Sequence, residues 1–258
     1  TDFLKENPIP FYIIPGNHER SNLPASLFLN QPHLHIFHDA KIFIYHAGKF
    51  SIYLCGFPFV RHRLHHQWSH IVQQFDSIRD SEGLKLLLMH QAIEGATVGP
   101  VNFIFRRSED VLGQADIPDY FDAVLCGHIH RQQVIFKKRS DGSSMPVIFP
   151  GSTERTSFAE KNETKGFFDL TFYREENRWR IVYYFHPLHS RPMVDIPPEE
   201  TSGMNEDKIL TILSRIPEGS IIRFRFPRTR AVSEKSIALL QEIIRQYRDR
   251  YIFQFRHP

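Results

Sequence analysis

Short apolar runs that end in polar residues recur along the first part of the chain. The runs do not alternate and are too short for helices, which is typical of strands buried on both faces. Four segments have this pattern: Phe11 to Ile14, Leu84 to Met89, Ala123 to Cys126 and Val147 to Phe149. They predict four buried strands, each of which ends in a loop.

Alternating segments predict hairpins beside these strands. Lys41 to Phe59 is expected to turn near Gly48, and Gly166 to Val194 is expected to form two long strands joined at Glu175 to Asn177. The stretch from Leu64 to Ile78 is expected to be helical.

The pattern changes after Val194. Asp195 to Gly203 contains two prolines, two glutamates, a serine and a glycine, which is typical of a linker. Beyond it, Ile221 to Phe226 alternates as a half-buried strand does, and apolar residues recur at helical spacing from Ile237 to Tyr247. We therefore expect two domains, residues 1–194 and a small α+β domain over residues 204–258.

The composition is that of a globular protein, with 258 residues of which 41% are hydrophobic and 24% charged. Cys55 and Cys126 each lie in an apolar run, so we expect no disulfide scaffold and a reducing cytosol. No apolar stretch approaches the roughly 18 to 20 residues that cross a bilayer, and no signal peptide opens the chain, so no membrane partner is expected. The sequence begins with Thr1, and we expect it to be cut from something longer.

Charge is unevenly distributed. The net charge is +3, but ten of the 32 basic residues and only four of the 29 acidic ones lie from Arg215 onward. That segment therefore carries +6, and residues 1–214 carry −3. A basic C-terminal domain favours a polyanionic partner such as nucleic acid. The alternative is an ordinary solvated face.

Imidazoles follow three of the predicted buried strands. Asn17 and His18 lie in the sequence Gly-Asn-His-Glu after the first strand, His90 follows the second, and His128 and His130 lie in Gly-His-Ile-His after another. Loops at the carboxyl ends of strands form the ligand crevice of α/β sheets, so these groups can converge. Imidazole and amide ligands suit manganese, iron or zinc, and the absence of thiolate ligands argues against a structural zinc site.

In this order the three motifs resemble those of the calcineurin-like metallophosphoesterase superfamily. The resemblance implies an α/β fold, a two-sheet sandwich flanked by helices, with a centre of two divalent metal ions that cleaves phosphate esters. It implies that Asn17, His90 and His128 are ligands of one ion and that His130 is a ligand of the other. His18 matches the histidine that contacts the phosphate and assists the leaving group. Glu19 stands where an aspartate is more usual.

Within that superfamily, further segments are similar to the SbcD-type DNA double-strand-break repair nucleases. These segments are Leu86 to Gln91, Phe149 to Glu160, Lys165 to Phe167 and Ser190 to Met193. The small domain expected after the linker is a further similarity, since in that family such a domain caps the active site and helps to select DNA. The resemblance implies a manganese-dependent nuclease subunit with exonuclease and endonuclease activity. It also implies action on DNA ends as a homodimer with an SMC-like ATPase of the SbcC type, in the cytoplasm at the nucleoid.

The family's pattern opens with Asp-x-His and Gly-Asp-x-x-Asp, both upstream of the Gly-Asn-His motif. Neither precedes Asn17 in these 258 residues. In the family, the missing side chains include the carboxylate that bridges the two metal ions. We therefore expect this chain alone to bind manganese poorly, and a protein that carries all the motifs to hydrolyse phosphodiesters by a two-metal mechanism.

Three classes of function stay open. The first is the nuclease. The second is a metallophosphoesterase for a small phosphomonoester or cyclic nucleotide, against which the basic C-terminal domain argues. The third is a catalytically inactive scaffold that binds DNA ends, which the missing motifs permit.

Overall fold

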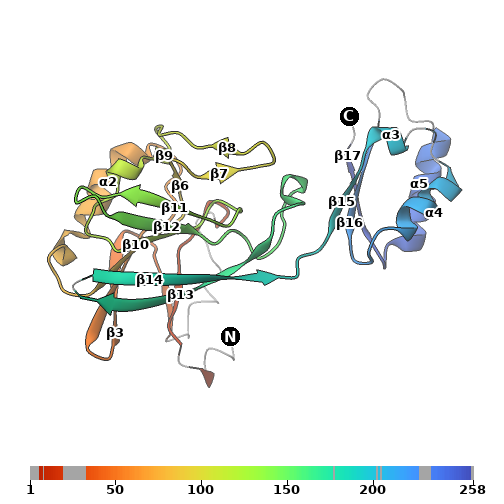
Figure 1. Cartoon of the computed structure of the whole chain (residues 1–258). Coiled ribbons are helices and arrows are strands. Elements are labelled where there is room, and N and C mark those ends of the chain that lie inside the picture. The colour runs from red at the N-terminus through yellow and green to blue at the C-terminus, as the bar shows by residue number, and fades with distance from the viewer. Residues whose placement is uncertain are drawn as a thin grey trace. The chain divides into compact units, whose positions relative to one another are not determined.

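The computed structural model of the chain describes residues 6–7, 9–19, 33–176, 178–201, 203, 205–226 and 234–256. The chain forms two compact units (Figure 1). The first consists of residues 1–152 and 166–187, and the second of residues 153–165 and 188–258. Each unit has a hydrophobic core of its own.

The first unit is built around a six-stranded mixed sheet with the strand order β11-β12-β10-β5-β4-β3. The strands are β3 (Lys41–Ala47), β4 (Phe50–Gly56), β5 (Leu84–Met89), β10 (Ala123–Cys126), β11 (Gln133–Lys138) and β12 (Ser144–Phe149). The four central strands are parallel, and the edge strands β3 and β11 are antiparallel to their neighbours. The expected buried strands over Leu84 to Met89 and Ala123 to Cys126 are confirmed, as is the hairpin that turns at Gly48.

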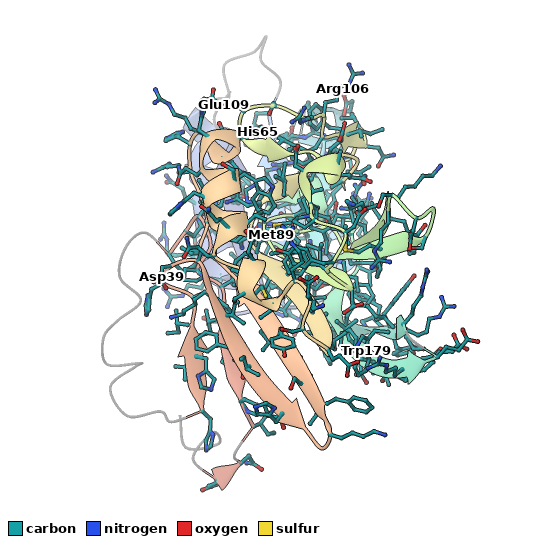
Figure 2. The ribbon with its side chains drawn as sticks, turned by 90° about the vertical axis from the view of Figure 1, so that its left-hand side faces the viewer. Asp39, His65, Met89, Arg106, Glu109 and Trp179 are labelled. Carbon is teal, nitrogen blue, oxygen red and sulfur yellow. The ribbon has the colours of Figure 1, made fainter. Side chains whose placement is uncertain are left out.

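Helix α2 (Leu64–Gln73) packs on one face of this sheet. Its buried residues Leu64, Trp68 and Ile71 are spaced so that they share one side of the helix. The predicted helix over Leu64 to Ile78 is divided, because α2 ends at Gln73 and a separate 3₁₀ turn, η2, spans Asp76–Ile78. Figure 2 shows Met89, the last residue of β5, in the interior of this layer.

A second layer of strands covers the opposite face. It contains the parallel pair β1 (Phe11–Ile13) and β2 (Leu34–Ile36) and the hairpin β13 (Lys165–Glu175) and β14 (Arg178–Leu188). Aromatic side chains such as Tyr12 and Trp179 pack there on Leu54 and Leu86 of the central sheet. The two layers with a helix outside them confirm the expected α/β sandwich.

Short strand pairs project from the loop between β5 and β10. β6 (Ala92–Ile93) pairs with β9 (Val111–Leu112), and β7 (Thr97–Val98) pairs with β8 (Phe103–Ile104). The 3₁₀ turn η3 (Gln114–Asp116) follows. The side-chain amide of Gln133 accepts from the N–H of Thr97 (2.8 Å) and donates to its carbonyl (2.9 Å), which fixes the base of the β7–β8 hairpin.

The second unit contains a parallel sheet in the order β15-β16-β17, formed by β15 (Met193–Ile196), β16 (Ile221–Arg225) and β17 (Ile252–Arg256). Helices α4 (Glu206–Ser214) and α5 (Glu234–Tyr247) pack on one face of it (Figure 1). The Asn205 side chain caps α4 by accepting from the N–H of Lys208 (2.9 Å). None of the helices formed by the described residues has the length and apolar character that a membrane crossing requires.

The stretch from Asp195 to Gly203 is not a linker, contrary to our expectation. Its first residues belong to β15, and Pro198–Thr201 forms the short helix α3. Pro198 opens this helix, where its fixed φ is favourable and its missing N–H is not needed. The longer segment of the second unit begins at Leu188, whereas our expected domains were residues 1–194 and 204–258.

Residues 153–165, which include the 3₁₀ turn η4 (Phe158–Glu160), also belong to the second unit. The guanidinium of Arg223 lies 4.0 Å from the centroid of the Phe158 ring. Arg155 donates to the carbonyls of Arg191 (2.9 Å) and Glu163 (3.0 Å). The contacts with Arg223 of β16 and with Arg191 before β15 connect the segment to the rest of the second unit, and the bond to Glu163 closes the segment on itself.

Candidate metal centre

Three of the predicted metal ligands meet at one edge of the central sheet. His90 directly follows β5, and His128 follows β10 after one glycine. These strands are parallel neighbours, so their carboxyl ends lie side by side. Asn17 comes from the loop after β1, in the second layer. The structure thus gathers three side chains that are far apart in the sequence.

The imidazole of His90 lies between two turns that contain glycine. A Cβ atom added to Gly16 would lie 2.7 Å from Cε1 of His90, and one added to Gly127 would lie 2.6 Å from Nδ1. Any larger residue at either position would therefore displace the ring. In the space that the glycines leave, Nε2 of His90 lies 3.0 Å from Oδ1 of Asn17.

His128 has an unusual backbone conformation. Its φ is 75°, and the N–H of Ile129 donates to the carbonyl of Gly127 (2.9 Å), which closes a three-residue turn around His128. Such turns with positive φ are rare and strained, and backbone strain is concentrated at functional sites. The Nδ1 atom of His128 is buried and has no hydrogen-bond partner among the described residues. This nitrogen is therefore available to a ligand.

His18 and His130 lie at the margin of this cluster. His18 is exposed, and His130 is partly buried. The carbonyl of His130 accepts from the N–H of Ser152 (3.1 Å), which ties the Gly-His-Ile-His loop to the loop after β12. Gly151 has a φ of 78°, and a Cβ atom there would lie 2.7 Å from the carbonyl oxygen of His130.

The electrostatics keep the inner imidazoles neutral. Burial, and then the neighbouring His128, lowers the pKa of His90 to about 4. Burial, followed by the charges of His130 and His18, lowers the pKa of His128 as well. The neutral ring is the form of histidine that binds a metal ion.

The donors gathered at this edge match part of a metal site. Within the described ranges, no three His, Cys, Asp or Glu side chains lie together in a way that could hold one. The donors brought together are two imidazoles and the amide oxygen of Asn17. Two donors each about 2.0–2.2 Å from one ion at a right angle lie about 3 Å apart, which agrees with the separation between Asn17 and His90. Together with the unpartnered Nδ1 of His128, this donor set fits part of the coordination sphere of a divalent ion.

Phe59, which we did not identify from the sequence, contacts both imidazoles. Its ring centroid lies 5.4 Å from that of His128 and 5.9 Å from that of His90. It comes two residues after Phe57, which is buried in the core. Strand alternation would place Phe57 and Phe59 on the same side of the chain, so no sequence signal separates Phe59 from a core residue.

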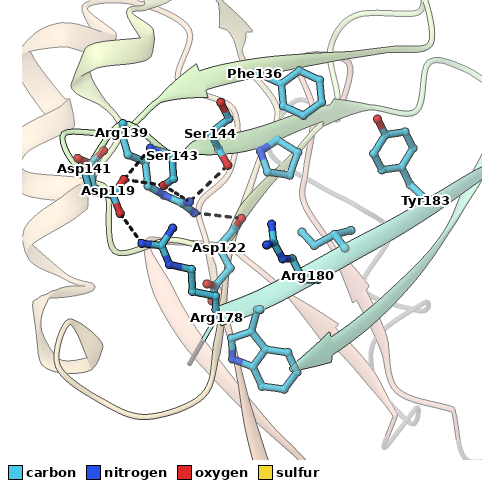
Figure 3. Close-up of a pocket in the computed structure, with 14 residues that line it drawn as sticks. Asp119, Asp122, Phe136, Arg139, Asp141, Ser143, Ser144, Arg178, Arg180 and Tyr183 are labelled. Atoms are coloured by element: carbon cyan, nitrogen blue, oxygen red, sulfur yellow. Dashed lines mark hydrogen bonds and ion pairs between the residues drawn. The ribbon is translucent and has the colours of Figure 1, made fainter. Parts of the chain in front are cut away.

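A separate pocket of about 640 Å³ lies between the β11–β12 turn and β14 (Figure 3). It includes none of the predicted site residues. Its arginines are engaged: Arg178 pairs with Asp141 (3.1 Å), and Arg139 donates to the carbonyl of Phe121 (2.8 Å). We assign no function to it.

The basic residues of the second unit are largely paired within that unit. Every arginine from Arg215 onward whose side chain is described has a carboxylate partner. The pairs are Arg215–Glu200, Arg223–Asp195, Arg225–Asp195, Arg245–Glu242, Arg248–Asp249 and Arg250–Glu218. The other basic side chains, those of Arg228, Arg230, Lys235 and Arg256, lie outside the described part of the chain. Because Arg223 and Arg225 share Asp195, the six described arginines exceed their carboxylate partners by one.

The chain is similar to known phosphoesterases and DNA repair proteins. Residues 1–132 match the calcineurin-like phosphoesterase family. The chain is 29% identical over 176 residues to the DNA double-strand break repair protein Mre11 of Methanocaldococcus jannaschii, which covers 66% of the chain and 43% of that protein. It is 27% identical over 179 residues to the protein of the same name from Methanococcus maripaludis, which covers 64% of the chain and 43% of the relative.

The matched region thus spans less than half the length of these two relatives. The family match covers half of this chain and includes the Gly-Asn-His and Gly-His-Ile-His motifs together with His90. It confirms the resemblance that these motifs indicated. The chain belongs to the calcineurin-like phosphoesterase family.

Proposed function

We propose that the protein is a manganese-dependent nuclease subunit that acts on DNA ends in double-strand-break repair. The observation that carries the proposal is the meeting of Asn17, His90 and His128 at the carboxyl edge of the sheet, in a phosphoesterase chain similar to two Mre11 proteins. Similarity to proteins named for double-strand break repair favours DNA as the substrate.

The roles of the site residues follow the family motifs. Asn17, His90 and His128 would hold one divalent ion, and His130 would contribute to a second. When bound, such ions acidify water and offset charge on phosphate oxygens. His18, which is exposed beside the cluster, would contact the phosphate and pass a proton to the leaving oxygen.

The partners belong to the same proposal. We expect DNA ends, an SMC-like ATPase subunit and a second copy of the chain, with the complex located at the nucleoid in the cytoplasm. The support is the similarity to Mre11 proteins together with the net charge of +6 from Arg215 onward.

The alternative is a phosphoesterase for a small phosphomonoester or cyclic nucleotide. It is favoured by the internal ion pairs of the second unit, because an arginine already paired with a carboxylate contributes less to binding a polyanion. A third possibility is an inactive scaffold that binds DNA ends without cutting them.

One experiment separates the three. The protein at its full encoded length is freed of metal, supplied with Mn²⁺, and incubated with end-labelled duplex DNA, p-nitrophenyl phosphate and cyclic AMP in parallel. The nuclease proposal requires DNA cleavage that depends on Mn²⁺ and is lost in His90→Ala. Hydrolysis of a small substrate without DNA cleavage would establish the alternative, and binding of DNA ends without hydrolysis of any substrate would establish the scaffold.

A further inference from the structure

We propose that Phe59 is a positioning residue of the metal centre. Its ring sets the planes of His90 and His128, and its main chain holds the loop that carries Asn17. This inference rests on the proposed function, since it assigns a role toward the metal that those residues would bind. It adds a residue that is neither a ligand nor a contact to the substrate.

The aromatic contacts fix two rings in two different orientations. The Phe59 ring is stacked on His128, with 25° between the ring planes, and meets His90 edge to face at 89°. The two imidazoles also touch each other, with centroids 5.3 Å apart and planes at 68°. Rotation of either imidazole about its Cβ–Cγ bond would break a favourable aromatic geometry.

Two ring contacts hold the plane of the His128 imidazole. The unpartnered Nδ1 is the nitrogen left for the metal ion, so among the described residues it makes no hydrogen bond that would orient the ring. The stacked ring of Phe59 and the ring of His90 are the described contacts that fix this plane.

The main chain around Phe59 joins the loops of the site. The N–H of Phe59 donates to the carbonyl of Pro15 (2.9 Å), two residues before Asn17. The next carbonyl, that of Val60, accepts from the side chain of Gln91 (3.3 Å), which is 1% exposed and adjacent to His90. The loop after β4 is thereby connected to the loops after β1 and β5.

The neighbouring Phe57 supplies a matched control. It is 1% exposed and packs on Trp68 at 5.8 Å, on the helix side of the sheet. Replacement of Phe57 by leucine would disturb the core, whereas replacement of Phe59 by leucine would remove the ring beside the imidazoles. The two substitutions are chemically identical and two residues apart.

The test compares Phe59→Leu, Phe59→Tyr and Phe57→Leu with the unaltered protein at its full encoded length. The first measurement is the chemical shift of the histidine Cε1–H groups by NMR in the metal-free protein. The Phe59 ring current should shift the His128 signal, and Phe59→Leu should remove that shift while Phe59→Tyr keeps it. The second measurement is Mn²⁺ affinity by electron paramagnetic resonance of the free ion.

We expect Phe59→Leu to weaken Mn²⁺ binding by about 10- to 100-fold, the range found for residues that orient metal ligands. Phe59→Tyr should bind Mn²⁺ like the unaltered protein, and Phe57→Leu should lower the melting temperature but leave the histidine signals and the affinity unchanged. Unchanged affinity in Phe59→Leu, or an equal loss in Phe57→Leu, would overturn the positioning role alone. Failure of the unaltered protein to bind Mn²⁺ would instead overturn the proposed metal centre, and with it any role of Phe59 toward a metal.

Discussion

The Nε2 atom of His90 lies 3.0 Å from Oδ1 of Asn17, although 73 residues separate them. The two side chains come from different layers, since Asn17 follows β1 and His90 follows β5 of the six-stranded sheet. Their distance therefore depends on how the layers pack, and on the bond from the N–H of Phe59 to the carbonyl of Pro15. The site can therefore form only when the layer that contains β1 is packed against the six-stranded sheet.

In the protein at its full encoded length, His18→Ala should abolish DNA cleavage and spare metal binding. The side chain is exposed at the margin of the cluster and is assigned to the substrate. Loss of a proton donor lowers turnover by about 10²- to 10⁴-fold. Cleavage rates and Mn²⁺ content are measured on the same preparation, and a variant that loses Mn²⁺ would show that His18 is a ligand.

Gly127→Ala should weaken metal binding although it removes no donor. The new Cβ atom would lie 2.6 Å from Nδ1 of His90, so the ring must shift and its 3.0 Å approach to Asn17 must change. Gly113→Ala is the control, because the nearest atoms to its Cβ would belong to the side chains of Asp116 and Arg107, at a comparable 2.7 Å, and not to His90. Mn²⁺ titration of both variants checks this, and equal affinities would mean that His90 can shift without cost.

The chain of residues 1–258 alone should bind Mn²⁺ weakly and should not cut DNA. Its described cluster offers two imidazoles and one amide, with no carboxylate among the three donors. Calorimetric titration with Mn²⁺ measures the number of sites and their strength. Two tight sites would contradict this expectation and would require ligands that the family motifs do not include.

Asp195→Asn should destabilise the second unit, and the effect should depend on pH. The carboxylate is 7% exposed and accepts from Nε (3.0 Å) and a terminal nitrogen (2.9 Å) of Arg223. Burial alone would raise the pKa of Asp195, but the hydrogen bonds and charge of Arg223, together with the charges of Arg225 and Lys161, lower the pKa below its ordinary value. The stabilisation is therefore present above about pH 4 and is lost as pH falls through the lowered pKa.

At pH 7 the loss should be about 1.5–3 kcal/mol, as for a hydrogen bond to a charged group. Hydrogen exchange of the β16 amides measures it locally. The difference between the variant and the unaltered protein should shrink below pH 4. A difference that stays constant from pH 7 to pH 3 would show that the charge of Asp195 is not the cause.

Salt titration of DNA binding should separate the arginines of the second unit. Arg228→Gln and Arg230→Gln should each lower the slope of log affinity against log salt by about 0.9 if these residues contact duplex phosphates. Arg250→Gln should change the slope less, because Arg250 already pairs with Glu218. His18→Ala in all variants prevents cleavage during the measurement, and identical slopes throughout would favour the small-substrate alternative.

The sequence predicted the elements whose signal is local. Continuous apolar runs identified β5 and β10, because strands covered on both faces need no polar positions. The same reasoning missed β15, since Met193 to Ile196 pairs with β16 across a long stretch of chain that no periodicity reveals. Proline and glutamate in the next segment suggested a linker, but Pro198 and Glu199 are also favourable residues for the first turn of a helix.

The sequence predicted those residues of the candidate site that are recognisable by their type and by their position at the end of a strand. His90 and His128 could be named because polar side chains after neighbouring buried strands gather at one edge of a sheet. Asn17 was identified by its motif, since β1 pairs outside that sheet and the expectation of a buried strand was wrong there: Phe11 is 49% exposed. Phe59 could not, since a phenylalanine after a strand is usually a core residue and only its ring contacts distinguish it from Phe57. The strained φ of His128 is likewise invisible in the sequence.

The second unit consists of two pieces of sequence, residues 153–165 and 188–258, and the β13–β14 hairpin of the first unit lies between them in the chain. During synthesis, residues 153–165 are made before every strand of the sheet on which they pack. Phe158 therefore cannot contact Arg223 until the β13–β14 hairpin, β15 and β16 have been synthesised. The first unit can therefore close first, in agreement with domains folding in order from the N-terminus. If residues 188–258 alone were exchanged with those of a relative, Phe158 and Arg155 would meet side chains from the other protein. A chimaera must therefore exchange residues 153–165 together with residues 188–258.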